Sequence, residues 1–281
     1  MIKLREQRKH IAQETLQILG QGFYTALSGK RVDISGLQNF SELNSRLITP
    51  ERGRLLVKPL TVAADDHCAT CEVVNESTVR SIVNSAHSGE TVAALNFASA
   101  KNPGGGFLGG SMAQEEALAY SSGLYKTQLR HLAYYEKNRA YGSMTYTDHA
   151  IYSPFVPFFR DEGLTLLETP VACSILTLPA VNIGQVYEKG ENAAKAKQIM
   201  KDRMRIALAI LAYEKNSTII LGAFGCGVFG NDPKDVARWW RELLIDEKYN
   251  RFFGRVLFAV LDKPNGPNIK AFEDVFGRLN K

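Results

Sequence analysis

The chain has 281 residues and a formal net charge of +5 at pH 7, with 45% hydrophobic and 22% charged residues. These values are typical of a globular protein with one large domain, and four cysteines are too few for a disulfide-rich scaffold. The lysines and arginines are scattered along the chain, so the sequence does not predict direct binding to nucleic acid.

No apolar segment follows the basic N-terminus, and no run of roughly 18 apolar residues occurs further along the chain. The sequence therefore predicts neither a signal peptide nor a membrane span. We expect a monomeric cytoplasmic protein with no membrane partner. Delivery to another cell by a route that needs no signal peptide is the alternative that this pattern leaves open.

Residues 1–65 are predicted to form a helical accessory segment that packs on a main domain of residues 66–281. An apolar stripe indicates a helix over residues 3–20, and the glycines that follow it end the helix. The stripe consists of Leu4, Ile11, Leu16, Ile18 and Leu19. The stretch 21–55 contains turn signals and no clear periodicity.

A strand–helix alternation begins after this segment. Short runs rich in Val, Ile and Leu predict buried strands at residues 71–75, 92–97, 150–153, 172–180, 218–224 and 255–262. Helical patterns between and after them predict helices at residues 77–86, 191–215, 232–245 and 268–279. This order predicts a three-layer α/β domain with a mixed or mostly parallel sheet, whose ligand binds at the carboxyl ends of the strands.

Two glycine-rich loops follow two of the predicted strands. The first, after 92–97, contains Gly104, Gly105 and Gly106; the second, after 218–224, contains Gly222, Gly225, Gly227 and Gly230 and leads into a helix start at Asp232. Neither loop matches a P-loop or a dinucleotide fingerprint. We expect them to form two walls of one cleft, in which backbone amides bind phosphate without a lysine or a metal ion. The alternative is that each loop is only a tight turn.

Gln114, Glu115 and Glu116 come shortly after the triple glycine, at the start of a predicted helix. Adjacent helical residues point roughly 100° apart, so the two glutamates do not face one reacting atom in the same way. We expect one glutamate to perform chemistry and the other to orient a sugar hydroxyl. The alternative is a solvated first helical turn, where acidic side chains suit the helix dipole.

Other conspicuous residues have simpler interpretations. Cys68 and Cys71 form a C-x-x-C without two further ligands at suitable spacing, so no metal site is predicted, and Cys226 is expected to pack as a small residue. The pair Trp239-Trp240 is predicted to be buried in the core. His149 is expected to be structural, and Ser121-Ser122 has no partnered His–Asp pattern that would support nucleophilic catalysis.

Several stretches together resemble one family. "LNFASAKNPGGGFLGG", "AQEEAL", "SSGLY", "IYSPFVPFFR", "LTLPAVN" and "LGAFGCGVFGNDP" occur in the order found in bacterial-type poly(ADP-ribose) glycohydrolases. The resemblance covers nearly the whole chain and implies a macrodomain fold with ADP-ribose in a cleft at the strand ends and no cofactor. It also implies that Glu116 is the catalytic acid and that Glu115 holds ribose hydroxyls.

The resemblance further implies an ADP-ribose-binding set. Asn96 and Asn102 would meet ribose hydroxyls, and Glu76 would lie against the adenine amine. The triple-glycine loop would pass close to the distal ribose and the diphosphate, and the second loop would hold the diphosphate, with Phe229 near the distal ribose. The complete set is Glu76, Asn96, Asn102, Gly104, Gly105, Gly106, Gln114, Gly225, Cys226, Gly227, Val228, Phe229, Gly230 and Asn231.

The implied reaction is hydrolysis of the ribose–ribose O-glycosidic bond of poly(ADP-ribose), which releases ADP-ribose. Glu116 would protonate the leaving oxygen and then activate a water. Two alternatives stay open: a hydrolase for single ADP-ribose units on protein side chains such as arginine, and a non-catalytic ADP-ribose-binding module. Departures from the family pattern at Ala119-Tyr120 and at Phe155 raise the first alternative.

Overall fold

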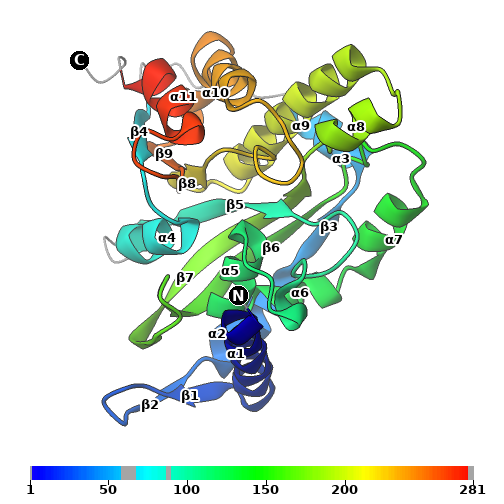
Figure 1. Ribbon diagram of the computed structural model, residues 1–281. Coiled ribbons are helices and arrows are strands. Elements are labelled where there is room, and N and C mark those ends of the chain that lie inside the picture. The colour runs from blue at the N-terminus through cyan, green and yellow to red at the C-terminus, as the bar shows by residue number, and fades with distance from the viewer. Residues whose placement is uncertain (1, 58–67, 87–89, 278–281) are drawn as a thin grey trace.

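The computed structural model describes residues 2–57, 68–86 and 90–277 (Figure 1). A central sheet has seven strands in the order β3-β6-β7-β5-β8-β9-β4. Their bounds are β3 (Arg46–Ile48), β6 (Ala150–Arg160), β7 (Leu166–Pro179), β5 (Val92–Ala98), β8 (Thr218–Leu221), β9 (Arg255–Ala259) and β4 (Thr70–Val74). Neighbouring strands from β7 to β4 are parallel, and β6 is antiparallel to both of its neighbours. The predicted mixed sheet is confirmed.

Helices cover both faces of this sheet (Figure 1). On one face lie α3 (Pro50–Val57), α8 (Ile183–Glu188), α9 (Ala193–Tyr213), α10 (Pro233–Arg241) and α11 (Pro267–Phe276). On the other lie α1 (Ile2–Gln21), α2 (Ser35–Asn44), α4 (Thr78–Ala86), α5 (Gln114–Ser121) and α6 (Leu124–Leu129), and α7 (Leu132–Ala140) packs beside β6. None of the helices in the described ranges is long and apolar enough to cross a bilayer.

The central strand β5 shows why a strand covered on both faces is largely apolar. Its side chains alternate between the two faces, so Ala93 and Leu95 join the core under α9, whereas Val92 and Ala94 join the core under α4. Because both faces are covered, every position is buried except Phe97, which is half-buried and lines the cleft. The predicted core position of Trp239 and Trp240 is also confirmed, since they are 7% and 0% exposed.

Some element ends differ from the prediction. Strands β6 and β7 are longer than expected because they pair with each other as an antiparallel ribbon. Strand β8 ends at Leu221 instead of residue 224, because the backbone at Gly222 approaches β9 so closely that a methyl group there would stand 2.6 Å from the Ala259 carbonyl oxygen. The helix expected to reach residue 245 ends as an α-helix at Arg241 and continues as a π-helical turn, η2 (Glu242–Asp246).

The N-terminal segment is not purely helical. It contains a small hairpin, β1 (Phe23–Thr25) with β2 (Arg31–Asp33), and its strand β3 pairs with β6 at the edge of the central sheet. These strands are only three residues long, too short to produce a period-2 pattern in the sequence. The segment is therefore partly built into the main domain. The expected boundary at residue 65 lies outside the described residues.

Parallel pairing of β5 with β8 places the two glycine loops side by side. Val92, Ala93 and Ala94 are in register with Thr218, Ile219 and Ile220, respectively. The carboxyl ends of both strands therefore meet at one edge of the sheet, from which both loops emerge. This is the arrangement expected if the two glycine loops form two walls of one cleft.

Candidate active site

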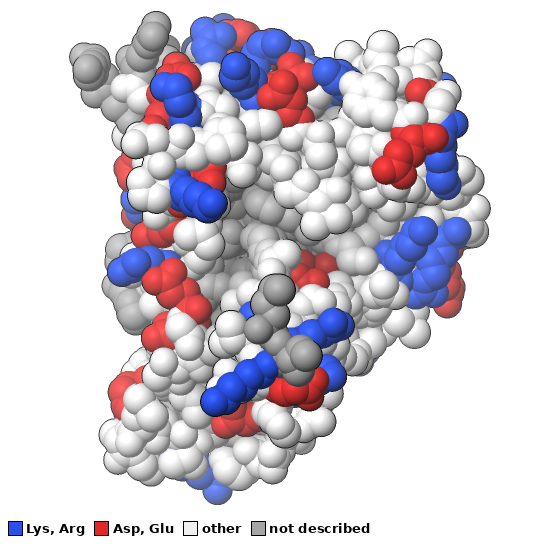
Figure 2. Space-filling model, in the orientation of Figure 1, with Lys and Arg blue, Asp and Glu red and all other residues white. Residues whose placement is uncertain are grey.

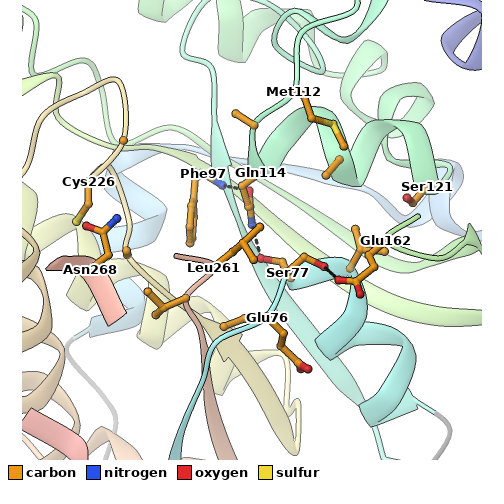
Figure 3. A pocket seen from close by; sticks show the side chains of 18 of the residues that line it. Glu76, Ser77, Phe97, Met112, Gln114, Ser121, Glu162, Cys226, Leu261 and Asn268 are labelled. Carbon is orange, nitrogen blue, oxygen red and sulfur yellow. Dashed lines mark hydrogen bonds between the residues drawn. The ribbon is translucent and has the colours of Figure 1, made fainter. Parts of the chain in front are cut away.

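The strand ends open into one cleft made of two adjoining cavities of about 400 Å³ each. Both cavities are lined by Phe97, Ala113, Gln114, Ala223 and Gly227, which makes them continuous. The glutamate cavity has, in addition, Asn102, Gly105, Gly106, Glu115, Glu116 and Phe229. The apolar cavity, shown in Figure 3, has Val79, Leu164, Cys226, Ala259, Val260 and Leu261. Figure 2 shows this face of the molecule hollowed at its centre.

Glu116 is fixed by two backbone donors. It is the third residue of α5, and its Oε2 reaches back to accept the N–H of Ala113 at 2.9 Å, which satisfies a donor at the helix start. Its Oε1 accepts the N–H of Gly106 at 2.8 Å. The side chain is 8% exposed, and this exposed part faces the glutamate cavity. The carboxylate therefore joins the helix to the glycine loop in one defined geometry.

Glu115 is surrounded by three donors. Its Oε2 accepts the Ser99 N–H at 2.7 Å, and its Oε1 accepts side-chain amides of Gln128 at 2.9 Å and Asn96 at 3.2 Å. Burial raises the pKa of Glu115 to about 8; the charge of Glu116 raises this pKa as well, and the three hydrogen bonds oppose the shift. Glu115 therefore retains its proton near neutral pH.

This raised pKa makes the stability of the protein depend on pH. The ordinary value of 4.5 applies to the unfolded chain, so the contribution of Glu115 is fully present below pH 4.5 and is lost as the pH rises through about 8. Between pH 5 and pH 9 we expect wild type to lose on the order of a few kcal/mol of unfolding free energy relative to Glu115→Gln. Urea titrations at both pH values measure this difference. Parallel pH curves for the two proteins would contradict it.

Gly105 stands between the two carboxylates. A methyl group on it would lie 2.5 Å from Glu116 Oε1 and 3.0 Å from Glu115 Oε2, and its φ of +60° disfavours other residues. The two glutamates, although adjacent on a helix, thus converge on the same backbone atom from different directions. The triple glycine allows the loop to lie directly against both side chains.

The first loop does not offer free amides to an anion, which corrects one expectation. The N–H of Gly104 donates to Gln128 Oε1, that of Gly105 to the Asn102 carbonyl, and that of Gly106 to Glu116. Every N–H of the triple glycine is therefore satisfied within the protein. The glycines are required for close approach and positive φ, and any phosphate must find its donors elsewhere.

The second loop, in contrast, has free backbone N–H groups. The N–H groups of Gly227, Val228 and Phe229 have no acceptor among the described residues, and all three residues line the glutamate cavity. Successive free N–H groups in a turn form an anion-binding concavity. The start of this loop is held by Trp240, whose indole N–H donates to the Gly222 carbonyl at 3.1 Å. The ring of Phe229 packs 6.0 Å from that of Tyr146.

Comparison with known proteins identifies the family. Residues 12–161, more than half of the chain, match the family model described as "Microbial-type PARG, catalytic domain". The chain belongs to the microbial-type PARG family. A search of curated proteins gives no match.

Solved structures of PARG, poly(ADP-ribose) glycohydrolase, are similar over most of the chain. The enzyme from Thermomonospora curvata is 39% identical with a TM-score of 0.93, covering 96% of this chain and all of that one. The same enzyme bound to the inhibitor ADP-HPD is 38% identical with a TM-score of 0.88, covering 96% and 99%, respectively. The enzyme from Deinococcus radiodurans, crystallised with ADP-ribose, is 43% identical with a TM-score of 0.82, covering 88% and 100%.

Asn96, Gln114 and Asn231 are held by hydrogen bonds inside the protein, and their contact with ADP-ribose stays a prediction. Asn96 is fully buried beneath Glu115, and its amide nitrogen also contacts Thr177. Gln114 lines the cleft, but its amide bonds to the backbone of β5 through the Phe97 N–H and the Leu95 carbonyl. The side-chain amide hydrogens of Asn96 and Gln114 are already used, so we expect both residues to have a positioning role.

Asn231 is also held internally, and the remaining predicted residues line one or both cavities, except Gly104 and Gly230, which line neither. The Asn231 amide donates to the carbonyls of Val181 and Gly225 and thereby closes the second loop. Glu76 lines the apolar cavity, but its carboxylate is turned toward α4, where it accepts the Ser81 hydroxyl at 2.6 Å. Its contact with an adenine amine stays a prediction. Cys226 also lines this cavity (Figure 3).

The two departures from the family pattern lie away from the cleft. Tyr120 is fully buried, its ring packs against Phe107, and its hydroxyl is 2.8 Å from the Phe107 carbonyl. Ala119 is buried beside it. Phe155 stands at a bulge of β6 with φ of +48° and contacts Phe40 of α2. The expectation that these positions mark a different substrate therefore has no structural support.

The other conspicuous residues form neither a metal site nor a nucleophilic triad, although Ser121 lines the apolar cavity. Within the described ranges, no group of three His, Cys, Asp or Glu side chains could hold a metal ion. His149 is half-buried and contacts the Thr147 hydroxyl. Ser121 and Ser122 are buried, and Ser122 donates to the carbonyl of Leu118 in its own helix.

The N-terminal helix braces the active site, a role that the sequence did not predict. Arg5 and Arg8 of α1 donate through Nε to the carbonyls of Gly109 and Gly110, both at 2.8 Å. Thr15 of the same helix donates to the carbonyl of Tyr120 at the end of α5. The helix thus holds both the glycine loop and the helix that carries the glutamates. No sequence pattern connects segments about a hundred residues apart.

Gln128 is a further residue that sequence reasoning missed. It is fully buried on α6, donates to Glu115 and accepts the N–H of Gly104 at 2.8 Å. Replacement with leucine leaves both partners unsatisfied, and we expect a loss of roughly 2–4 kcal/mol in unfolding free energy. We also expect a lower kcat because Glu115 and the loop lose their common support. Urea titration and steady-state kinetics measure both effects, and an unchanged kcat in a folded variant would contradict the positioning role.

Proposed function

We propose that this chain hydrolyses the ribose–ribose bond of poly(ADP-ribose) and releases ADP-ribose. The observation that carries the proposal is the convergence of two buried carboxyl groups on one glycine, at one end of a cleft between two glycine loops. Membership of the microbial-type PARG family supports it, as do relatives crystallised with ADP-ribose or ADP-HPD.

The shape of the cleft supports one orientation of the ligand. An adenine ring fits the apolar cavity beside Phe97 and Leu261, whereas a ribose fits the glutamate cavity. The free N–H groups of residues 227–229 lie on the wall of the glutamate cavity, where they suit the diphosphate between these two ends. Phe229 of the same loop then packs against the distal ribose.

The mechanism follows from the position of the two glutamates. The glycosidic oxygen needs a proton as the bond breaks, and Glu116 faces the cavity where that oxygen would lie. Glu115 accepts hydrogen bonds from three fixed donors and orients a ribose hydroxyl. After cleavage, the deprotonated Glu116 carboxylate acts as a base and activates the water that attacks the anomeric carbon. The diphosphate charge stabilises the cation that forms in between.

The test compares polymer with a single unit. The enzyme is incubated in parallel with purified poly(ADP-ribose) and with a protein mono-ADP-ribosylated on arginine, and released ADP-ribose is quantified. We expect release from the polymer at a rate far above that from the arginine protein. The opposite preference would favour the mono-ADP-ribosyl hydrolase. Binding of ADP-ribose without turnover of either substrate would favour a non-catalytic reader.

A further inference from the structure

The cleft has room for one ADP-ribose unit, so the rest of a polymer must leave it at the scissile end. Under the proposed function, on which this inference rests, the next unit is attached at the oxygen that Glu116 protonates. It therefore leaves through the mouth of the glutamate cavity, where Asn102 is an exposed lining residue. Each further unit adds a diphosphate, and its negative charges need partners at that mouth.

Two basic residues lie beside this mouth, next to the lining residue Asn102. The hydroxyl of Ser99 accepts the N–H groups of Lys101 at 3.2 Å and Asn102 at 3.1 Å, while the Ser99 N–H donates to Glu115. This turn sets Lys101 one residue from the cavity wall. Arg139, at the end of α7, donates through Nε to the Lys101 carbonyl at 2.9 Å. The two basic residues are thus joined to each other and to the active-site turn.

Neither cation is neutralised by the protein. Lys101 and Arg139 are exposed, and in the described part of the chain neither forms an ion pair with an acidic side chain. Glu136 is the acidic residue of α7, and it does not pair with them. The terminal guanidinium nitrogens of Arg139 are left to form a fork toward an external anion. Figure 2 shows basic side chains beside the central hollow on the side where Figure 1 places α7.

We propose that Lys101 and Arg139 bind the diphosphate of the second ADP-ribose unit, the one adjoining the unit in the cleft. The diphosphate carries two negative charges, which the two positive side chains of Lys101 and Arg139 match. The pair thereby favours polymer over ADP-ribose attached to a protein side chain, because only the polymer places a diphosphate there. A single-stranded nucleic acid also carries phosphates, so the test includes it as a competitor.

The test is the double variant Lys101→Gln/Arg139→Gln. Its matched control is Lys30→Gln/Lys195→Gln, which removes the same charge from exposed residues on the β1–β2 hairpin and at the start of α9. We expect the KM for polymer to rise roughly 3- to 10-fold in the test variant and its salt dependence to weaken. The kcat and the calorimetric Kd for free ADP-ribose should stay within about twofold of wild type, and Lys101→Arg/Arg139→Lys should recover most of the loss.

Three outcomes would overturn the proposal. The first is a polymer KM equal to that of the control variant. The second is an equal loss of affinity for free ADP-ribose, which would place the pair in the first subsite. The third is equally strong competition by a single-stranded RNA of matched length. Polymer affinity is also measured directly by filter binding. If the wild-type protein shows no hydrolytic activity, the proposed function is refuted, but filter binding still tests whether Lys101 and Arg139 bind the polymer.

Discussion

Replacement of Glu116 by glutamine is expected to reduce ADP-ribose release from polymer by roughly 10²–10⁴-fold, the usual contribution of a positioned proton donor. An amide cannot give up a proton at neutral pH, whereas the residues expected to bind ADP-ribose are unchanged. Binding of free ADP-ribose, measured by calorimetry, should remain. Loss of rate together with loss of binding would point to a distorted cleft instead of a missing acid.

The hydrogen bonds of Glu116 determine how this variant must be controlled. Both carboxylate oxygens accept backbone N–H groups, so a glutamine amide would face one donor with its own NH₂. We expect this mismatch to cost roughly 1–3 kcal/mol of unfolding free energy. Glu116→Ala avoids the mismatch but loses the contact at the helix start, at a cost of about 1 kcal/mol. Agreement between the two variants in rate and in retained binding assigns the chemistry to the carboxyl group, and full activity in either one refutes it.

Replacement of Gly105 by alanine is expected to have a comparable effect on turnover without removing any reactive group. The added methyl would stand 2.5 Å from Glu116 Oε1, so the loop and the carboxylate must separate. Displacing a catalytic group by about 1 Å costs roughly 10²-fold in rate. Kinetics with purified polymer measure this loss.

Gly29→Ala is the matched control for this variant. Gly29 also has a positive φ, +85°, but nothing lies within 4 Å of its added methyl. Both variants should lose about 1–2 kcal/mol of stability from backbone strain, because each forces alanine into the left-handed region. Only the change at Gly105 should lower turnover. Near-normal activity in Gly105→Ala would mean that the close approach of loop and glutamates is not needed.

The sequence predicted those parts of the molecule that depend on local patterns. Strands such as β5 are largely apolar because both faces are covered, and α10 begins where Asp232 caps a helix with proline at its first position. The two glycine loops were placed in one cleft by the rule for strand ends. The pair Glu115-Glu116 stands out because it follows the triple glycine, but its expected roles come from the resemblance to the PARG family.

Contacts between distant segments could not be predicted in this way. Gln128 reaches Gly104 across 24 residues, and Arg8 reaches Gly110 across 102 residues, with no periodic pattern to indicate either contact. For the same reason, the internal hydrogen bonds of Asn96, Gln114 and Asn231 could not be predicted, and these residues were expected only to contact the ligand. A polar residue near a strand end is compatible with ligand binding, but only the structure shows that Asn96 spends its hydrogens on Glu115 and Thr177.

The most direct test of the central claim is a time course with purified poly(ADP-ribose) and wild-type protein, with products separated by chromatography. We expect ADP-ribose to accumulate as polymer disappears, until nearly all of the polymer has been released as monomer. Intact polymer after prolonged incubation with protein that still binds ADP-ribose would contradict the claim.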